Sequence, residues 1–335
     1  MSPETILDIR NLRVSIPTDR GLLNAVRGVD LSLRTGETLC LVGESGCGKS
    51  LTATALMGLL PRHARQDADR FALMGQDYAG KPARAWSGLR GRELAMIFQD
   101  PMNSLNPTLT VGRQMTEGVV HSEGIDQSAA NQRAVDLLER VGIAHAKARL
   151  SQYPHQFSGG QRQRIMIAAA LMGRPRLLIA DEPTTALDVT IQAQILDLIR
   201  ELQRDLDLGV LMITHDLGVV AAIATEVAVM YAGQIVERAP AANLYGNPQH
   251  PYTQGLLAAI PVPGRTARGS HLAAIPGRVP GLIGKLDGCA FRDRCVRVMP
   301  ACATGSVPAS LVAPDHMATC HHLVPAGARV SEGAQ

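Results

Sequence analysis

The chain of 335 residues is poor in aromatic side chains, in excess charge of either sign and in long apolar runs. Aromatic residues make up 3% of it, too few for the stacking surface that single-stranded nucleic acids require. Lys and Arg number 33 and Asp and Glu number 30, so the net charge of +3 gives no basic face for a duplex. These absences argue against a nucleic-acid partner.

Signals for a membrane span or for export are also missing. A spanning helix needs about 20 consecutive apolar residues, whereas the best candidate, residues 217–231, is shorter and contains Glu226. We predict a helix followed by a buried strand there. The first residues include Glu4, Asp8 and Arg10 and have no secretory apolar core. We therefore expect a cytosolic chain with reduced, unpaired cysteines.

Short apolar runs without alternation predict an α/β fold with a parallel sheet. Such runs are typical of strands buried on both faces, and they occupy residues 39–42, 177–180, 210–214 and 227–230. Between them, residues 134–141 and 191–202 carry apolar side chains at helical spacing. The alternation indicates helices packed on both faces of the sheet.

The pattern of apolar residues and prolines changes along the chain and predicts its domain boundaries. Residues 1–240 are expected to form one domain, in which residues from about 103 to 175 show no clear strand and form a helical subdomain. After residue 240, prolines recur at short intervals and interrupt any long element. Residues 241–335 are therefore predicted to be a separate, irregular, Cys-rich extension.

A phosphate-binding loop is predicted between an apolar strand and a helix. Residues 43–50 fit the pattern G-x-x-x-x-G-K-[ST], and the glycines allow successive backbone N–H groups to point inward. Lys49 would contact the β- and γ-phosphates of a nucleotide, and Ser50 would hold Mg²⁺. The residues expected to surround the phosphates are contiguous: Gly43, Glu44, Ser45, Gly46, Cys47, Gly48, Lys49, Ser50 and Leu51.

Cys47 has two possible roles in this loop. A thiol near a helix N-terminus can have a lowered pKa and react readily. The simpler interpretation, which we favour, is a small residue that fills space.

Two further segments carry groups suited to nucleotide chemistry. An apolar strand ends in Asp181, placed to bind Mg²⁺ through water or the shell of Ser50, and Glu182, placed to polarise an attacking water. A second turn could bind an anion at a helix start. It consists of Ser158, Gly159, Gly160 and Gln161.

Together with Gln99, Asp188 and His215, these blocks resemble the ATP-binding subunits of ABC transporters, from about residue 5 to 240. The resemblance implies a P-loop NTPase core that works as a head-to-tail pair. Each ATP would lie between the phosphate loop of one subunit and the 158–161 turn of the other. Gln99 would contact the Mg²⁺ and water side, and His215 would hold the γ-phosphate and position Glu182. Asp188 would link the two sites.

One position departs from that family. An aromatic ring usually lies on the adenine, but no aromatic residue precedes Phe71, and Ile16 occupies about the expected place. An aliphatic contact lacks the stacking worth ~1–3 kcal/mol per base. Base selectivity is therefore open, although ATP remains the expected nucleotide.

Residues 97–107, 153–157 and 250–254 resemble the oligopeptide and dipeptide importers within this family. This implies a second ATPase subunit in a heterodimer, two transmembrane permease subunits and an extracytoplasmic substrate-binding protein. The chain would be peripheral, on the cytoplasmic face of the bacterial inner membrane. Nickel and glutathione importers share much of the pattern, so these cargoes are alternatives to peptides.

The extension contains four cysteines that could bind a metal group. Their spacing is C-x5-C-x6-C-x17-C, and four thiolates can hold Zn²⁺ or a [4Fe–4S] cluster. Some peptide-importer ATPases carry an iron–sulfur cluster at this spacing, so the resemblance favours the cluster over Zn²⁺ or inert thiols. We expect the nearby histidines 316, 321 and 322 to be solvated. The predicted ligands are Cys289, Cys295, Cys302 and Cys320.

Other functions fit less well. Soluble ABC-type ATPases of DNA repair or translation generally have long coiled coils or two cassettes, and neither is present. A regulatory module that only binds nucleotide would not need Glu182 and His215. A P-loop kinase would not need the turn at residues 158–161.

Overall fold

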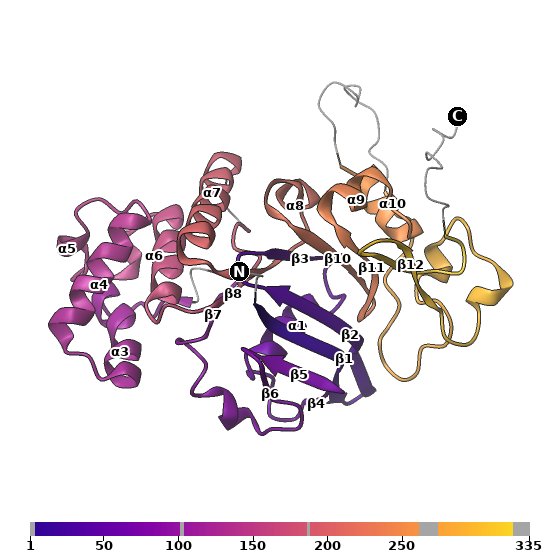
Figure 1. Cartoon of the computed structure of the whole chain (residues 1–335), viewed down its shortest axis with the longest axis horizontal. Helices are drawn as coiled ribbons and strands as arrows, with labels where there is room; N and C mark the ends of the chain where they lie inside the picture. The colour runs from indigo at the N-terminus through magenta and orange to yellow at the C-terminus, as the bar shows by residue number, and fades with distance from the viewer. Residues whose placement is uncertain (1–3, 101–103, 186–187, 261–273, 324–335) are drawn as a thin grey trace.

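The structure is a computed structural model that describes residues 4–100, 104–185, 188–260 and 274–323. Its centre is an eight-stranded sheet in the order β12-β13-β11-β10-β3-β9-β8-β7, with neighbours β10 to β7 parallel (Figure 1). The parallel strands are β7 (Leu94–Ile97), β8 (Leu177–Asp181), β9 (Gly209–Thr214), β3 (Thr38–Val42) and β10 (Glu226–Tyr231). The predicted parallel α/β sheet is confirmed, and all four predicted apolar runs lie in it.

A second, antiparallel sheet covers one face of the central sheet. Its order is β2-β1-β5-β6, and β4 also pairs with β1. Sequence reasoning did not identify these strands, because their apolar and polar residues alternate irregularly around bulges. The members are β1 (Thr5–Thr18), β2 (Gly21–Arg34), β4 (Arg65–Asp67), β5 (Arg70–Leu73) and β6 (Gln76–Asp77).

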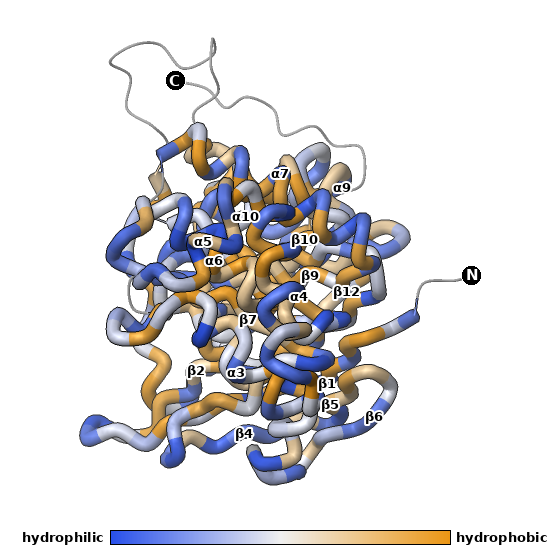
Figure 2. The backbone as a smooth tube through the Cα atoms, turned by 90° about the vertical axis from the view of Figure 1, so that its left-hand side faces the viewer, coloured by the Kyte–Doolittle hydropathy of each residue, from blue (hydrophilic) through white to orange (hydrophobic). Residues whose placement is uncertain are grey.

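The core is divided in two because side chains alternate across the faces of the central strands. Leu39 and Leu41 of β3 pack with the antiparallel sheet and with α1 (Lys49–Leu56). Cys40 and Val42 face the other way, toward α7 (Val189–Leu206) and α8 (Leu217–Ile223). Figure 2 shows apolar segments concentrated along the central strands. Among the described residues, no helix has the length and hydropathy that crossing a membrane requires.

The part of the chain that connects β7 to β8 forms a lobe of helices, at the left of Figure 1. Side chains close two of the helix starts by accepting backbone N–H groups, Thr110 for α3 and Asp126 for α4. The lobe contains α3 (Val111–Glu123), α4 (Gln127–Arg140), α5 (Ala146–Arg149), η2 (Pro154–Gln156) and α6 (Gly159–Leu171). The short η1 (Ala83–Trp86) precedes β7.

The described part of the C-terminal extension contains more helices and strands than its prolines suggest. Its hairpin joins the central sheet, where β13 (His316–Thr319) pairs with β11 (Gln234–Pro240), so the extension is not separate from the sheet. Pairing between segments about 80 residues apart leaves no local pattern for sequence reasoning to detect. The other elements are α9 (Ala241–Gly246), α10 (Pro251–Ala258), η3 (Arg292–Arg294), η4 (Pro300–Cys302) and β12 (Ala309–Ala313).

Candidate nucleotide site

The phosphate loop runs from the end of β3 into α1 and requires glycine at two positions. A Cβ on Gly43 would lie 2.2 Å from the backbone oxygen of Met230, and one on Gly48 would lie 2.5 Å from that of Ala25. Both glycines also have positive φ, 155° and 111°. The loop is therefore pressed against β10 and β2, and its curvature depends on residues without side chains.

Lys49 lies inside the curve of this loop. Its ammonium donates to the backbone oxygens of Gly43 at 2.7 Å and Glu44 at 3.1 Å, and the residue is 5% exposed. The positive charge is thus held where phosphate oxygens are expected. Cys47 is fully buried, and burial raises the pKa of its thiol. This supports the space-filling interpretation of Cys47 rather than a reactive thiol.

Two oxygen donors lie side by side at the start of α1. The hydroxyl of Ser50 donates to the carboxylate of Asp181 at 3.2 Å. Burial raises the pKa of Asp181, and the hydrogen bond from Ser50 offsets part of that effect. A divalent cation here would favour the ionised carboxylate and accept both oxygens as ligands, so these residues fit Mg²⁺.

Glu182 is the centre of a hydrogen-bonded group just beyond β8. Its carboxylate accepts from the Gln99 amide at 3.0 Å and the Thr185 hydroxyl at 2.9 Å, and lies 3.1 Å from Nδ1 of His215. Burial alone would raise the pKa of Glu182, but the hydrogen bonds from His215 and Thr185 bring the pKa below its ordinary value. The carboxylate is therefore ionised at neutral pH.

The arrangement of parallel strands explains why these residues meet. Glu182 follows β8, His215 follows β9 and Gln99 follows β7, and parallel strands end at the same edge of a sheet. Sequence reasoning placed all three at this site but assigned no role to Thr185. Its position three residues after Glu182, in the turn that follows the strand, was the available signal.

The turn at residues 158–161 lies elsewhere. It starts α6 in the helical lobe, away from α1 in Figure 1, and Ser158 and Gln161 close it by two reciprocal hydrogen bonds of 3.1 and 3.3 Å. Ser158, Gly159 and Asp188 are exposed, and Asp188 caps α7 through the N–H of Ile191. Within the described part of one chain, these residues do not join the phosphate loop. Residues 101–103 of the predicted segment 97–107 fall outside that part, as do residues 186–187, which directly precede Asp188.

Sequence reasoning missed two contacts between the extension and the phosphate loop. The hydroxyl of Tyr252 accepts the N–H of Glu44 at 2.9 Å. The guanidinium of Arg294 donates to both carboxylate oxygens of Glu44, at 2.6 and 2.9 Å. Tyr252 belongs to a segment that indicated only the importer subfamily, and Arg294 carried no signal beyond its place beside Cys295.

The four cysteines of the extension gather without forming a metal site. Burial raises the pKa of Cys320, and Cys289, Cys295 and Cys302 are close enough to raise it further. Burial also raises the pKa of Cys289, and the nearby thiols of Cys302 and Cys295 raise it further. All are free thiols, and the described residues include no group of three or more His, Cys, Asp or Glu set to hold a metal.

The expectation that the nearby histidines are solvated is wrong for His316. It is 1% exposed, and its Nε2 lies 2.8 Å from the buried carboxylate of Glu237. The same carboxylate accepts the N–H groups of Gln249 and His250 at 2.7 and 2.9 Å. His316 therefore holds the hairpin of the extension to β11.

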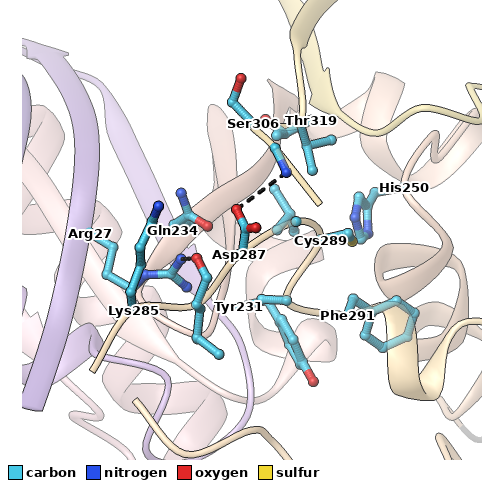
Figure 3. A pocket seen from close by; sticks show the side chains of 16 residues that line it. Arg27, Tyr231, Gln234, His250, Lys285, Asp287, Cys289, Phe291, Ser306 and Thr319 are labelled. Carbon is cyan, nitrogen blue, oxygen red and sulfur yellow. Dashed lines mark hydrogen bonds between the residues drawn. The ribbon is translucent and has the colours of Figure 1, made fainter. Parts of the chain in front are cut away.

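A cavity of about 400 Å³ is lined by residues of the extension and of β10, β11 and β2 (Figure 3). Arg27, Tyr231 and Cys289 are among its lining residues, whereas the phosphate loop, Asp181 and Glu182 are not. Ile16 lies in β1 opposite Leu23 and does not line this cavity either. The contact of Ile16 with adenine stays a prediction.

Comparison with known proteins identifies the family. Residues 26–185 match the family model described as "ABC transporter", and residues 236–302 match that of the oligopeptide/dipeptide transporter C-terminal region. The dipeptide transport ATP-binding protein DppD of Bacillus subtilis is 49% identical over 300 residues, which cover 89% of each chain. The chain belongs to the ABC transporter family.

Other members of the ABC family agree with this assignment. The oligopeptide transport ATP-binding protein OppD of Salmonella typhimurium is 45% identical over 315 residues, covering 94% of this chain and 93% of that one. Among solved structures, cbiO1 of Clostridium perfringens matches with a TM-score of 0.61 and 26% identity over 72% of this chain and 91% of that one. The predicted fold is confirmed, and the chain is an ABC-type ATPase.

A more distant likeness concerns the fold alone. A dimeric ATP-binding cassette in a post-hydrolysis state, bound to ADP and phosphate, matches with a TM-score of 0.60 and 23% identity. The match covers 70% of this chain and 99% of that one.

Proposed function

We propose that this ABC-type ATPase powers the import of dipeptides or oligopeptides through a membrane transporter. The match of residues 236–302 to the peptide-transporter C-terminal region carries the proposal, because the cassette core is common to transporters of many cargoes. The names of the relatives with 45 to 49% identity support it. The ATPase would be peripheral, bound to the cytoplasmic face of the inner membrane through two permease subunits and supplied by an extracytoplasmic binding protein.

Each site residue has a proposed role in hydrolysis. Glu182 accepts a hydrogen bond from the attacking water and orients it, which its ionised state allows. His215 contacts the γ-phosphate and holds Glu182, while Gln99 reports the state of the water and Mg²⁺ side. Lys49 neutralises charge on the β- and γ-phosphates. Ser50 and Asp181 would hold Mg²⁺, which neutralises further charge on the phosphate oxygens.

A second ATPase subunit completes the site in this proposal. The 158–161 turn is exposed and lies apart from the phosphate loop of its own chain, which supports its use on the nucleotide of a facing subunit. The dimeric cassette of the same fold supports such a pairing. Asp188, exposed at the start of α7, would contact the partner. A related but different chain is the proposed partner.

Reconstitution in lipid vesicles with the permease pair tests this function. ATP hydrolysis should rise when the binding protein is added with a dipeptide or a pentapeptide, and Glu182→Gln in this chain should remove the rise. Stimulation by nickel or glutathione but not by peptides would overturn the cargo. A rate of ATP hydrolysis that is the same with and without the membrane subunits would favour a soluble ATPase instead.

The cysteine group of the extension is proposed to hold a [4Fe–4S] cluster. The thiols already influence one another, and two of them accept backbone N–H groups, from Arg297 to Cys295 at 3.4 Å and from His322 to Cys320 at 3.3 Å. Binding would draw the four sulfurs together and cross-link a segment with little apolar core.

Anaerobic purification tests the cluster. A brown protein with visible absorbance near 400 nm and about four irons per chain is expected for a [4Fe–4S] group. A colourless protein that contains zinc, or no metal at all, would reject it. Replacing Cys302 by Ser is expected to abolish the absorbance, whereas replacing Cys40, which lies in the core, provides the matched control.

A further inference from the structure

Glu44, the second residue of the phosphate loop, is held from outside the loop by the C-terminal extension. Arg294 grips its carboxylate with two charged hydrogen bonds of 2.6 and 2.9 Å. Tyr252 accepts its backbone N–H at 2.9 Å. Both the side chain and the backbone of one loop residue are thus fixed by residues more than 200 positions away in the sequence.

Arg294 is itself held tightly. Its side chain is 4% exposed, and it donates to the backbone oxygens of Pro276 at 2.9 Å and Ile275 at 3.2 Å. Glu44 raises the pKa of Arg294, so the guanidinium stays charged. A buried guanidinium that donates hydrogen bonds on all sides has little freedom to move. The position of the extension therefore fixes the position of the Glu44 carboxylate.

Tyr252 is also locked in place. Its ring packs against Tyr231 and Phe291 with centroid separations of 4.7 and 5.4 Å, and it is fully buried. Tyr231 ends β10 of the central sheet, whereas Phe291 belongs to the extension, and Figure 3 shows both beside the cavity. The aromatic cluster joins core and extension directly behind the phosphate loop.

The position of Glu44 determines the position of the reacting groups next to it. The backbone oxygen of Glu44 accepts the ammonium of Lys49 at 3.1 Å and the N–H of Cys47 at 3.3 Å. The N–H of Glu44 is engaged by Tyr252 and is not offered to phosphate. A shift of Glu44 would therefore displace Lys49 and change the shape of the loop, whose later N–H groups are expected to face the phosphates.

We propose that the C-terminal extension positions the phosphate loop for ATP, with Arg294 and Tyr252 as positioning residues that act through Glu44. Arg294 also precedes Cys295, within the segment that carries three of the four cysteines. Any rearrangement of that segment would move Arg294 and, through its contact with Glu44, change the conformation of the phosphate loop. The proposal concerns nucleotide binding by a single chain and is independent of the transported cargo.

Equilibrium binding of a fluorescent ATP analogue to the full-length chain tests the proposal. Arg294→Gln should weaken binding about tenfold and Tyr252→Phe about threefold, since each removes hydrogen bonds to a loop that must keep its shape. KM for ATP should rise in parallel while kcat changes less than about twofold, because Glu182 and His215 are untouched. Arg278→Gln, at an exposed arginine of the same extension, is the matched control.

A double-mutant cycle separates positioning from general support of the fold. In a Glu44→Gln background, Arg294→Gln should weaken binding by no more than about twofold, because the contact is already disrupted. Equal losses in both backgrounds, or unchanged affinity in Arg294→Gln, would overturn the proposal. If Arg294→Gln does not fold, Tyr252→Phe decides the question, since wild-type affinity in that variant also overturns it. Thermal unfolding without nucleotide identifies a folding defect.

Discussion

The N-termini of α1 and α6 are both helix ends that could bind phosphate, but only one is open. At α1 the residue before the helix is Gly48, which has no side chain to accept an N–H, and Lys49 lies within the loop. At α6 the hydroxyl of Ser158 accepts the N–H of Gln161, and the amide oxygen of Gln161 accepts the N–H of Ser158. The α1 end thus has no side-chain cap, whereas a capping box between Ser158 and Gln161 shapes the α6 end.

A third helix end, that of α10, extends this comparison. His250 closes it by accepting the N–H of Tyr252 on Nδ1 at 3.0 Å, in a fully buried setting. In the function proposed above, the three ends differ in what completes them: a nucleotide at α1, a partner's nucleotide at α6 and the neutral imidazole of His250 at α10. On this proposal, the same backbone geometry serves ligand binding, assembly and fold stability, depending on the side chain at the cap.

Removing the charge at the open end should have the largest effect. Lys49→Ala leaves the β- and γ-phosphates without their nearest cation, so hydrolysis should fall at least about a hundredfold and ATP should bind weakly. Steady-state phosphate release and nucleotide binding measure both. Turnover at the wild-type rate would show that the α1 end is not the catalytic phosphate site.

Replacing the proposed water-orienting residue, Glu182, should slow hydrolysis but preserve the ATP-bound pair of subunits. Glu182→Gln should lower hydrolysis about 10²–10⁴-fold, because general-base assistance is lost. ATP should still bind, and pairing with the partner subunit should persist for longer in solution scattering. If ATP never induces pairing in this variant with the partner present, the role given to the α6 end is wrong.

Lowering the pH should protonate His250 and so remove the cap at the N-terminus of α10. Burial lowers the pKa of His250 to about 4, while the unfolded chain binds this proton near pH 6.5. Between these values the unfolded state binds more protons, so the stability that the neutral imidazole provides is lost as pH falls from about 6.5 to about 4. The loss should reach about 3 kcal/mol. Urea unfolding across this range measures it, with His250→Gln as the control that should flatten the dependence.

Removing the cap of α6 should have the smallest effect, and its effect on hydrolysis should appear only in the assembled protein. Ser158→Ala should leave ATP binding to the single chain unchanged but lower hydrolysis with the partner about tenfold. The lost cap should also cost about 1 kcal/mol of stability.

Asp126→Ala is the matched control for this variant, because Asp126 caps α4 in the same lobe, accepting from Ala129 at 2.9 Å. It should lose similar stability and keep its turnover. Equal loss of hydrolysis in both variants would mean that Ser158 only supports its helix.

Local patterns explain most of what could be predicted. The buried strands produce continuous apolar runs, and the phosphate loop needs its glycines, Lys49 and Ser50 in one short segment. Asp181 ends a strand and Glu182 follows it directly, so the meeting of Glu182 with His215 follows from parallel pairing. The antiparallel sheet was not predicted, because bulges in β1 and β2 disturb the alternation that would reveal it.

The amino-acid order by itself determined the parallel core, the curved phosphate loop and the residues at the carboxyl edge of the sheet, because each depends on neighbours in the chain or on the period of one element. Only the tertiary structure decided that Arg294 and Tyr252 hold Glu44, that His316 is buried on Glu237 and that the extension adds strands to the sheet. Those contacts join segments 79 to 250 residues apart. Their partners are selected by packing and charge in three dimensions, which leaves no periodic trace in the sequence.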